Sequence, residues 1–357
     1  MPVEITPSPY GNLSDGRTVH QFVLTNSRGV RVTLLDYGAT LASVAFPDRA
    51  GKVVDVTHGY DDLAGWLSNK SYFGANVGRF ANRIAAGKFS LDGKTYTLAT
   101  NNAPAGIPCH LHGGVSGFDK KLWQGHPVKK DAAAGVEFHY LSPDGEEGYP
   151  GKLSAKITYW LTEQNGLRIE FYATTDQATI VNLTNHVYWN LTGNPTAPIT
   201  GHEIRIDADG VLQVNQGLIP TGATQSVKDT PFDFTRSEQI GRRIDADDTL
   251  LKAGNGYDHC WVLRGPSGLS SAAHVHEPST GRTLELFTDQ PGLQLYTGNF
   301  LDGAAKGKSG VPYQFRTAFC LEPQKFPDSP NHNGFPSAIL RPGEIYSHVM
   351  EYRFSAQ

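Results

Sequence analysis

Residues 153–173 have the sequence LSAKITYWLTEQNGLRIEFYA, and this stretch decides the fold class. Apolar residues alternate with mostly polar ones on both sides of Asn165–Gly166: Leu153, Ala155, Ile157, Tyr159 and Leu161, then Leu167, Ile169, Phe171 and Ala173. A period of two is typical of a half-buried strand. Asn-Gly favours a tight turn, because its residues tolerate positive φ. The stretch therefore predicts an antiparallel hairpin.

The same pattern extends in both directions along the chain. Residues 88–98 predict a second hairpin around Asp92–Gly93, and residues 21–46 predict strands around the turn at 27–29. Further strands are expected at 203–206, 259–263, 283–288, 292–296, 318–321 and 345–354. Helical periodicity is weak, and only 61–67 and 236–240 could form short helices. Evenly spread strands separated by turns predict an all-β fold, a large antiparallel β-sandwich that forms a single domain over residues 1–357.

Composition limits the classes of function. The 357 residues include 39 Gly, 22 Pro and 10% aromatic residues, and the net charge is −4 without a basic stripe, which argues against a nucleic-acid partner. Neither an apolar run of about 20 residues nor a signal-peptide pattern is present, so we expect no membrane association. The odd count of cysteines, Cys109, Cys260 and Cys320, argues against a disulfide framework. We therefore expect a soluble, cytoplasmic protein with reduced thiols.

Residues 182–191, NLTNHVYWNL, are the most chemically diverse stretch of the chain. On a strand, alternation places one set of side chains on a single face: Asn182, Thr184, His186, Tyr188 and Asn190. Such a face suits the binding of a polyhydroxylated ligand. The alternative is a capped turn whose His is hydrogen-bonded within the protein.

Two further segments carry basic and imidazole side chains. Residues 78–84, GRFANRI, offer guanidinium groups that could bind sugar oxygens, although an Arg is more often solvated. His110 and His112 would share one face of a strand, which raises the question of a metal site. A cupin-like metal site would need a glutamate four or five residues after the second His, and those positions are Ser116 and Gly117. The other His-x-His pair, His274 and His276, has only Glu277 as a nearby partner. Gly113 and Gly114 favour a close backbone approach instead.

Two carboxylates complete the set of candidates. Asp258 lies in GYDHCW, where it could also cap a turn. Glu322 ends an apolar strand, and we expect Pro323 to stop the strand there. Partial burial at this position would raise the basicity of the carboxylate, and the alternative is a buried salt bridge to an Arg. Dinucleotide-binding, P-loop, nucleophile-elbow and calcium-loop patterns are absent from the sequence.

Taken in order, these segments resemble the aldose 1-epimerase (galactose mutarotase) family over nearly the whole chain. The motifs that carry the resemblance are NRIA at 82–85, LHGG at 111–114, GEEGYPG at 145–151, NLTNHVYWNL at 182–191, YDH at 257–259, QLYTGN at 294–299, LEPQ at 321–324, FPDSPNH at 326–332 and LRPGE at 340–344. Each motif alone is modest, and their shared order is specific.

The resemblance implies a large β-sandwich with an open cleft that binds a free sugar. It implies Glu322 as general base, His186 as general acid and His112 as a second catalytic histidine. It further implies sugar binding by Asn82, Arg83, Tyr188, Asp258 and Gln294. Trp189, Tyr188 or Phe300 could offer an apolar platform to the sugar ring.

The implied reaction is interconversion of the α and β anomers of free hexoses by acid–base ring opening. It needs neither a metal nor an organic cofactor. The expected partner is a small-molecule sugar, with no nucleic acid and no membrane, and the chain is expected to act as a monomer or weak dimer. Three alternatives remain. The first is a hexose-6-phosphate 1-epimerase, which would need extra basic residues, such as Arg79 beside Arg83, to bind the phosphate. The second is a non-catalytic sugar-binding protein, and the third, less well supported, is a β-sandwich lyase.

Overall fold

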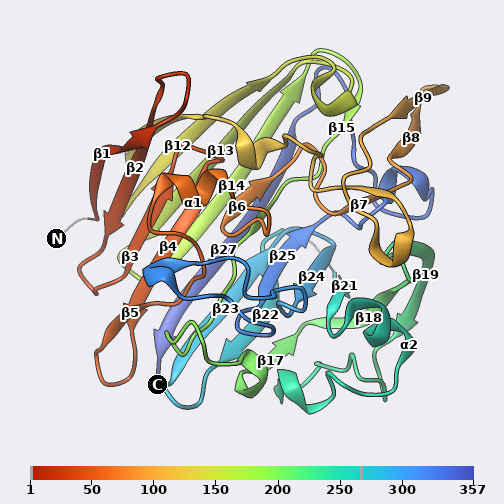
Figure 1. The fold of residues 1–357 in the computed structure, drawn as a ribbon. Helices are drawn as coiled ribbons and strands as arrows, with labels where there is room; N and C mark the ends of the chain where they lie inside the picture. Colours follow the sequence, from red (N-terminus) through yellow and green to blue (C-terminus); the bar gives the residue numbers. More distant parts are fainter. Residues whose placement is uncertain (1–2, 266–267) are drawn as a thin grey trace.

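A nine-stranded antiparallel sheet runs through the middle of the protein and contains the 153–173 hairpin (Figure 1). The computed structural model describes residues 3–265 and 268–357. Met1 and Pro2, which belong to the N-terminal stretch that was not expected to be a signal peptide, lie outside these ranges. In spatial order the strands are β11 (Gln124–Lys130), β12 (Ala133–Ser142), β13 (Leu153–Thr162), β14 (Gly166–Thr175), β27 (Tyr346–Ala356), β23 (Arg282–Thr288), β22 (Ser270–His276), β17 (Glu203–Ile206) and β20 (Glu238–Gln239). The predicted antiparallel sheet is confirmed.

Two five-stranded antiparallel sheets flank the central sheet, one toward the left of Figure 1 and one toward the right. The first contains β1 (Glu4–Asn12), β2 (Thr18–Thr25), β3 (Arg31–Leu35), β4 (Thr40–Pro47) and β5 (Val53–Asp55). The second has the order β19 (Pro220–Ser226), β18 (Ala208–Val214), β21 (Asp258–Leu263), β24 (Gly292–Tyr296) and β25 (Cys320–Gln324). This second sheet carries part of the candidate site.

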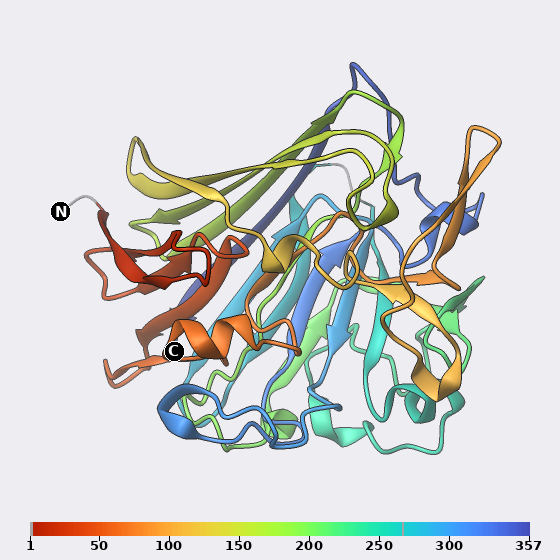
Figure 2. The same ribbon diagram turned by 45° about the horizontal axis from the view of Figure 1, so that its top comes forward.

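Short strand pairs lie outside these three large sheets. They are β7 (Arg83–Ala85) with β10 (Cys109–Leu111), β6 (Ala75–Val77) with β16 (Thr184–His186), β8 (Lys88–Leu91) with β9 (Lys94–Thr97), and β15 (Thr179–Ile180) with β26 (Ile339–Leu340). The β8–β9 hairpin projects from one side of the protein in both views (Figures 1 and 2).

One continuous apolar core joins the three large sheets. It includes Ile157 of the central sheet, Leu34 of the first flanking sheet and Leu293 of the second, each of which is fully buried. Inward-facing residues from opposed sheets interdigitate in this way in β-sandwiches. The predicted sandwich class is therefore confirmed.

The two predicted hairpins form, but through different turns. Asp92 and Gly93 both have positive φ, 51° and 77°, as the two-residue turn requires. In the longer hairpin only Asn165 has positive φ (62°), and Gly166 already begins β14. The backbone N–H of Asn165 donates to the Thr162 carbonyl. Three residues therefore connect those strands, with Asn165 in the left-handed position where a glycine is more usual.

Two short α-helices occur within the described ranges, α1 (Leu63–Leu67) and α2 (Thr249–Gly254). The first confirms the helix expected at 61–67, and Asp62 caps it by accepting from the Gly65 amide. The helix expected at 236–240 is wrong: that segment forms β20 followed by a 3₁₀ turn. No helix of the described residues is long and apolar enough to cross a membrane.

Pro323 does not end its strand, contrary to expectation. β25 continues to Gln324, and Pro323 lies opposite Leu293 of β24. β25 is the last strand of its sheet, where one side of the backbone has no ladder partner. A residue without an N–H is tolerated at such an edge.

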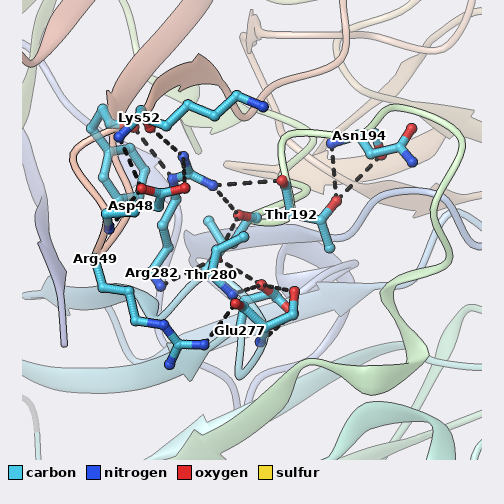
Figure 3. Close-up of polar contacts among 12 residues, drawn as sticks. Asp48, Arg49, Lys52, Thr192, Asn194, Glu277, Thr280 and Arg282 are labelled. Atoms are coloured by element: carbon cyan, nitrogen blue, oxygen red, sulfur yellow. Dashed lines mark hydrogen bonds and ion pairs between the residues drawn. The ribbon is translucent and has the colours of Figure 1, made fainter.

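A buried guanidinium fastens the first flanking sheet to the central one. Arg282 of β23 is 1% exposed and donates to the carbonyls of Lys52 (2.8 Å), Leu191 (3.1 Å) and Phe46 (3.3 Å). Figure 3 shows this guanidinium between Asp48 and Thr192. It therefore pins both the β4–β5 hairpin and the end of the 182–191 stretch to β23.

We expect Arg282→Met to lower the free energy of unfolding by about 3 kcal/mol. The reason is that each buried carbonyl left without a donor destabilises the folded protein by about 1–3 kcal/mol. Urea denaturation at pH 7 measures this change. The matched control is Arg353→Met on β27, whose Arg side chain is half exposed and pairs with Glu351. The control substitution should lower the free energy of unfolding by less than about 1 kcal/mol. Equal decreases in the two variants would contradict the anchoring role of Arg282.

Candidate active site

The register of the second flanking sheet brings several predicted residues together. Asp258 of β21 lies opposite Tyr296 of β24, which lies opposite Cys320 of β25. Two residues along, Gln294 lies opposite Glu322. Partners across an antiparallel ladder, and residues two apart on one strand, share a face. Asp258, Gln294 and Glu322 therefore stand on one surface of this sheet.

The short strand pairs bring the other predicted residues to this surface. β16 ends at His186, which lies opposite Ala75 of β6. β7 begins at Arg83, which lies opposite Leu111 of β10, so that His112 follows directly. Asn82, with φ of 65°, and His112, with φ of 51°, both take the left-handed conformation that is rare for non-glycine residues. Such outliers cluster at functional sites.

These segments enclose a cavity of about 470 Å³. Seven of the eight predicted site residues line it: Asn82, Arg83, His112, His186, Tyr188, Asp258 and Glu322. The eighth, Gln294, stands behind Asp258 and donates to it. A larger surface cavity of about 620 Å³ lies elsewhere, lined by mixed charges such as the Asp209–Arg264 ion pair.

A carboxyl group and an imidazole face each other in this cavity. His186 Nε2 lies 3.6 Å from Glu322 Oε1, and both side chains are almost fully buried. Burial raises the pKa of Glu322 well above its ordinary value, and the nearby Asp258 adds to this effect. Burial lowers the pKa of His186 to about 4. Because both shifts favour the neutral forms, a proton shared by the unliganded pair favours the carboxyl group over the imidazole.

His112 is held in a defined tautomer. Its Nδ1 accepts from the backbone N–H of Asn82 (3.2 Å), and its own backbone N–H donates to the Asn82 carbonyl. Burial lowers the pKa of His112 well below its ordinary value, so the ring is neutral and its proton lies on Nε2. His112 can therefore donate a hydrogen bond into the cavity.

Asp258 is fixed between two donors. Arg83 Nη2 lies 3.4 Å from one of its carboxylate oxygens, and Gln294 Nε2 donates to the other at 2.7 Å. Both Asp258 and Arg83 are buried, so neither the turn cap considered for Asp258 nor the solvated Arg is correct. The Arg–Glu322 salt bridge is also wrong, since Arg83 pairs with Asp258. Within the described ranges, Arg83 Nε and Glu322 Oε2 have no hydrogen-bond partner, which leaves both available to hydroxyl groups.

His112, His186 and Glu322 also deserve a test as metal ligands, because their donor atoms lie within 4.8 Å of one another. A metal-bound imidazole usually donates its second N–H to an acceptor. His112 Nδ1 instead faces the N–H donor of Asn82, so a metal on Nε2 would force two N–H groups together. The donor set therefore suits proton transfer better than metal binding.

Other sequence candidates have structural roles. His110 does not pair with His112, because its two ring nitrogens contact the Ala99 carbonyl and the Tyr149 hydroxyl. Asn182 and Asn190 lie outside the cavity lining and bond mainly to backbone groups. Trp189 is fully buried against Tyr352, so it offers no platform to a ligand.

The cavity also contains residues that sequence reasoning missed. Tyr72 lies over His112, with ring centres 4.7 Å apart, and nothing in its sequence neighbourhood signals this. Tyr296 could have been found, since it is two residues from Gln294 on one strand. Phe300, one of the suggested platforms, does line the cavity and remains about half exposed.

Comparison with known proteins agrees with this architecture. The family model described as aldose 1-epimerase matches residues 20–353. The chain is 45% identical to a galactose mutarotase of Bos taurus, over 99% of both chains. It is 39% identical to an aldose 1-epimerase of Escherichia coli, over 96% of this chain and 97% of that one. A solved aldose epimerase homologue from C. elegans superposes with a TM-score of 0.83 at 35% identity, covering 93% of this chain and 97% of that one.

Fold, site and relatives define an enzyme of the isomerase class that acts on carbohydrates. Within that class, the chain belongs to the aldose 1-epimerase family.

Proposed function

We propose that this enzyme interconverts the α and β anomers of free hexoses such as D-galactose and D-glucose, with Glu322 as general base and His186 as general acid. The observation that carries the proposal is the contact of 3.6 Å between His186 Nε2 and Glu322 Oε1. A protein that only binds sugar needs no such pair, since hydroxyl recognition can be met by Arg83, Asp258 and amide groups.

Anomer exchange requires two proton movements. Glu322 takes the proton of the C1 hydroxyl while His186 gives a proton to the ring oxygen, and the bond between C1 and the ring oxygen breaks. Rotation about C1–C2 then presents the other face of the aldehyde. In closure, His186 recovers its proton from the hydroxyl and Glu322 returns its proton to the new C1 oxygen.

One proton shared by the pair is sufficient for this cycle. The closed sugar needs ionised Glu322 with protonated His186, whereas the open sugar is matched by the neutral pair. The directions of the two pKa shifts favour the neutral pair in the unliganded enzyme. Sugar hydroxyls that donate to Glu322 offset the cost of ionising it, so binding prepares the reactive state.

The pH profile follows from this proton count. We expect kcat/KM for galactose to fall as the pH drops through about 4, where a second proton adds to His186 and the pair can no longer exchange. It should also fall as the pH rises through the raised pKa of Glu322, where the pair loses its shared proton. Initial rates by polarimetry from pH 3.5 to 8, corrected for spontaneous mutarotation, measure the profile. An acid limb centred near the ordinary histidine value of 6.5 would contradict the assignment.

Asp258→Asn should weaken sugar binding more than chemistry. Loss of the charge removes the ion pair that orients Arg83. We expect KM for galactose to rise about tenfold while kcat falls less than about threefold, as for an interaction made equally in the ground and transition states. Steady-state kinetics separate the two constants.

The matched control is Asp302→Asn, an exposed carboxylate in the loop that follows Phe300. It should leave both constants unchanged. An unchanged KM with a collapsed kcat in Asp258→Asn would instead assign Asp258 to the chemical step.

The direct test of the function is polarimetry of freshly dissolved α-D-galactose with the purified enzyme in weak buffer. We expect a rapid approach to the equilibrium rotation. A rate equal to that of buffer alone would overturn the proposal, and glucose 6-phosphate would then be tried in the same assay.

Phosphorylated hexoses are less well supported as substrates. Arg79, which could have joined Arg83 at a phosphate, makes its hydrogen bonds with Ser142 and with the carbonyls of Ser142, Pro143, Pro150 and Gly151. Arg83 is already paired with Asp258, whose charge would repel a dianion.

We further propose that residues 1–357 act as one domain and that the chain works as a monomer or weak dimer in the cytoplasm, without a cofactor. The residues that line the cavity are drawn from between Lys70 and Glu322 of one chain. This supports a single domain and a site that is complete in a monomer. The three cysteines are free and buried, which is consistent with a reducing compartment.

A further inference from the structure

We propose that Cys320 is a positioning residue that orients His186 for its proton exchange with Glu322. This inference rests on the proposed function and adds a residue for which neither the sequence patterns nor the family resemblance suggested a role.

A single strand contacts both nitrogens of the His186 ring. Cys320 Sγ lies 3.5 Å from Nδ1, an ordinary hydrogen-bond distance for sulfur, while Glu322 Oε1 faces Nε2. The two residues stand two positions apart on β25 and therefore on one face. β25 therefore places one partner at each ring nitrogen and sets the direction in which Nε2 points.

The thiol suits a histidine that must change protonation state. It can donate S–H to a bare Nδ1 or accept N–H from a protonated one, and it is a weak partner in both cases. A carboxylate at this position would stabilise the imidazolium and hold the proton on the ring. Burial raises the pKa of Cys320 well above its ordinary value, which keeps the thiol protonated and uncharged.

The remaining neighbours of His186 hold the ring by packing. Tyr188 stacks on it with ring centres 5.1 Å apart, and the Tyr72 ring lies 6.0 Å away at an interplanar angle of 29°. The titratable groups around it are Glu322 and Cys320 of β25, Asp258 of β21, His112 after β10, Tyr296 of β24, and Tyr72 and Tyr188. Among the hydrogen bonds of the described residues, Cys320 is the partner of Nδ1.

The test compares Cys320→Ala, Cys320→Ser and the control Val136→Ala. Val136 is equally buried, but it lies on β12 of the central sheet and does not line the cavity. We expect Cys320→Ala to lower kcat about tenfold with KM within about twofold of the wild type, the scale for the loss of one ordinary hydrogen bond. Cys320→Ser, whose hydroxyl also donates and accepts, should recover part of kcat, and Val136→Ala should match the wild type in kcat.

The second readout is the side-chain ¹⁵N spectrum of histidine-labelled enzyme, with the His186 signals identified by their loss in His186→Asn. Cys320→Ala should shift the Nδ1 signal of His186 and leave those of His112 in place. Unchanged kcat and ¹⁵N signals in Cys320→Ala, or an equal loss of kcat in Val136→Ala, would overturn the inference. If Cys320→Ala does not fold, the same comparison is made with Cys320→Val, which offers neither donor nor acceptor, and an unchanged Nδ1 signal in that variant would overturn the inference.

The spectrum also separates the two proposals. Wild-type enzyme that fails to accelerate mutarotation contradicts the proposed function, whereas the Nδ1 signal still reports whether Cys320 sets the state of His186.

Discussion

Glu322→Gln is expected to lower kcat for galactose by about a hundredfold or more, the usual scale for removing a positioned acid or base. The amide fills the same space but cannot take the C1 hydroxyl proton. The fold should be retained, because Glu322 is buried and has a raised pKa. A carboxyl whose pKa is raised on folding makes stability decline as the pH rises above its unfolded value. An uncharged amide is therefore expected to be at least as stable at pH 7.

Polarimetry and thermal unfolding of the same preparation measure both effects. The matched control is Glu285→Gln, an exposed glutamate on β23, which should change neither. A Glu322→Gln enzyme with near-normal kcat would remove Glu322 from the mechanism while leaving the reaction itself in place.

His186→Asn is expected to lower kcat by a similar factor, about a hundredfold or more, because the ring oxygen then lacks its proton donor. Because the two groups act on the same proton cycle, the double variant should be little worse than either single variant. Rates of the two single variants and the double variant, compared as a cycle, measure this non-additivity.

The matched control for this histidine is His126→Asn, an exposed residue on β11, which should behave as the wild type. Multiplicative losses in the double variant would show that Glu322 and His186 contribute independently, contrary to the shared-proton cycle.

Much of the fold followed from local patterns. Alternation in β13 and β14 reports burial of one face directly, and Asp92 and Asn165 mark turns because few residues accept positive φ. The prediction at Pro323 was wrong because the effect of a proline depends on whether its strand is central or at an edge, which is a property of the sheet. Helix α2 was missed although Asp248 caps it, because six residues show too little periodicity.

Site residues with chemically distinctive side chains could be predicted from the sequence. Site residues whose role depends only on how strands pair could not. His186, Glu322 and His112 were found through their side chains and the family resemblance, and they converge in one cavity. Tyr72 has ordinary sequence surroundings, whereas Cys320 stands two residues before Glu322 but nothing in the sequence pairs it with His186. The contacts of Cys320 with His186 and of Tyr72 with His112 depend on how distant segments come together. His110 shows the converse, since a chemically suggestive ring is fully used by Ala99 and Tyr149.

The wide sequence separation of the site residues has a consequence for how the enzyme matures. His186 and Cys320 stand 134 positions apart in the chain, and Arg83 and Asp258 stand 175 apart. Contacts of such long range form only after large loops have closed, and sheets built from them assemble slowly. Catalysis is therefore a property of the completed chain alone: a nascent or partly refolded polypeptide can hold most of its hairpins and still have no turnover.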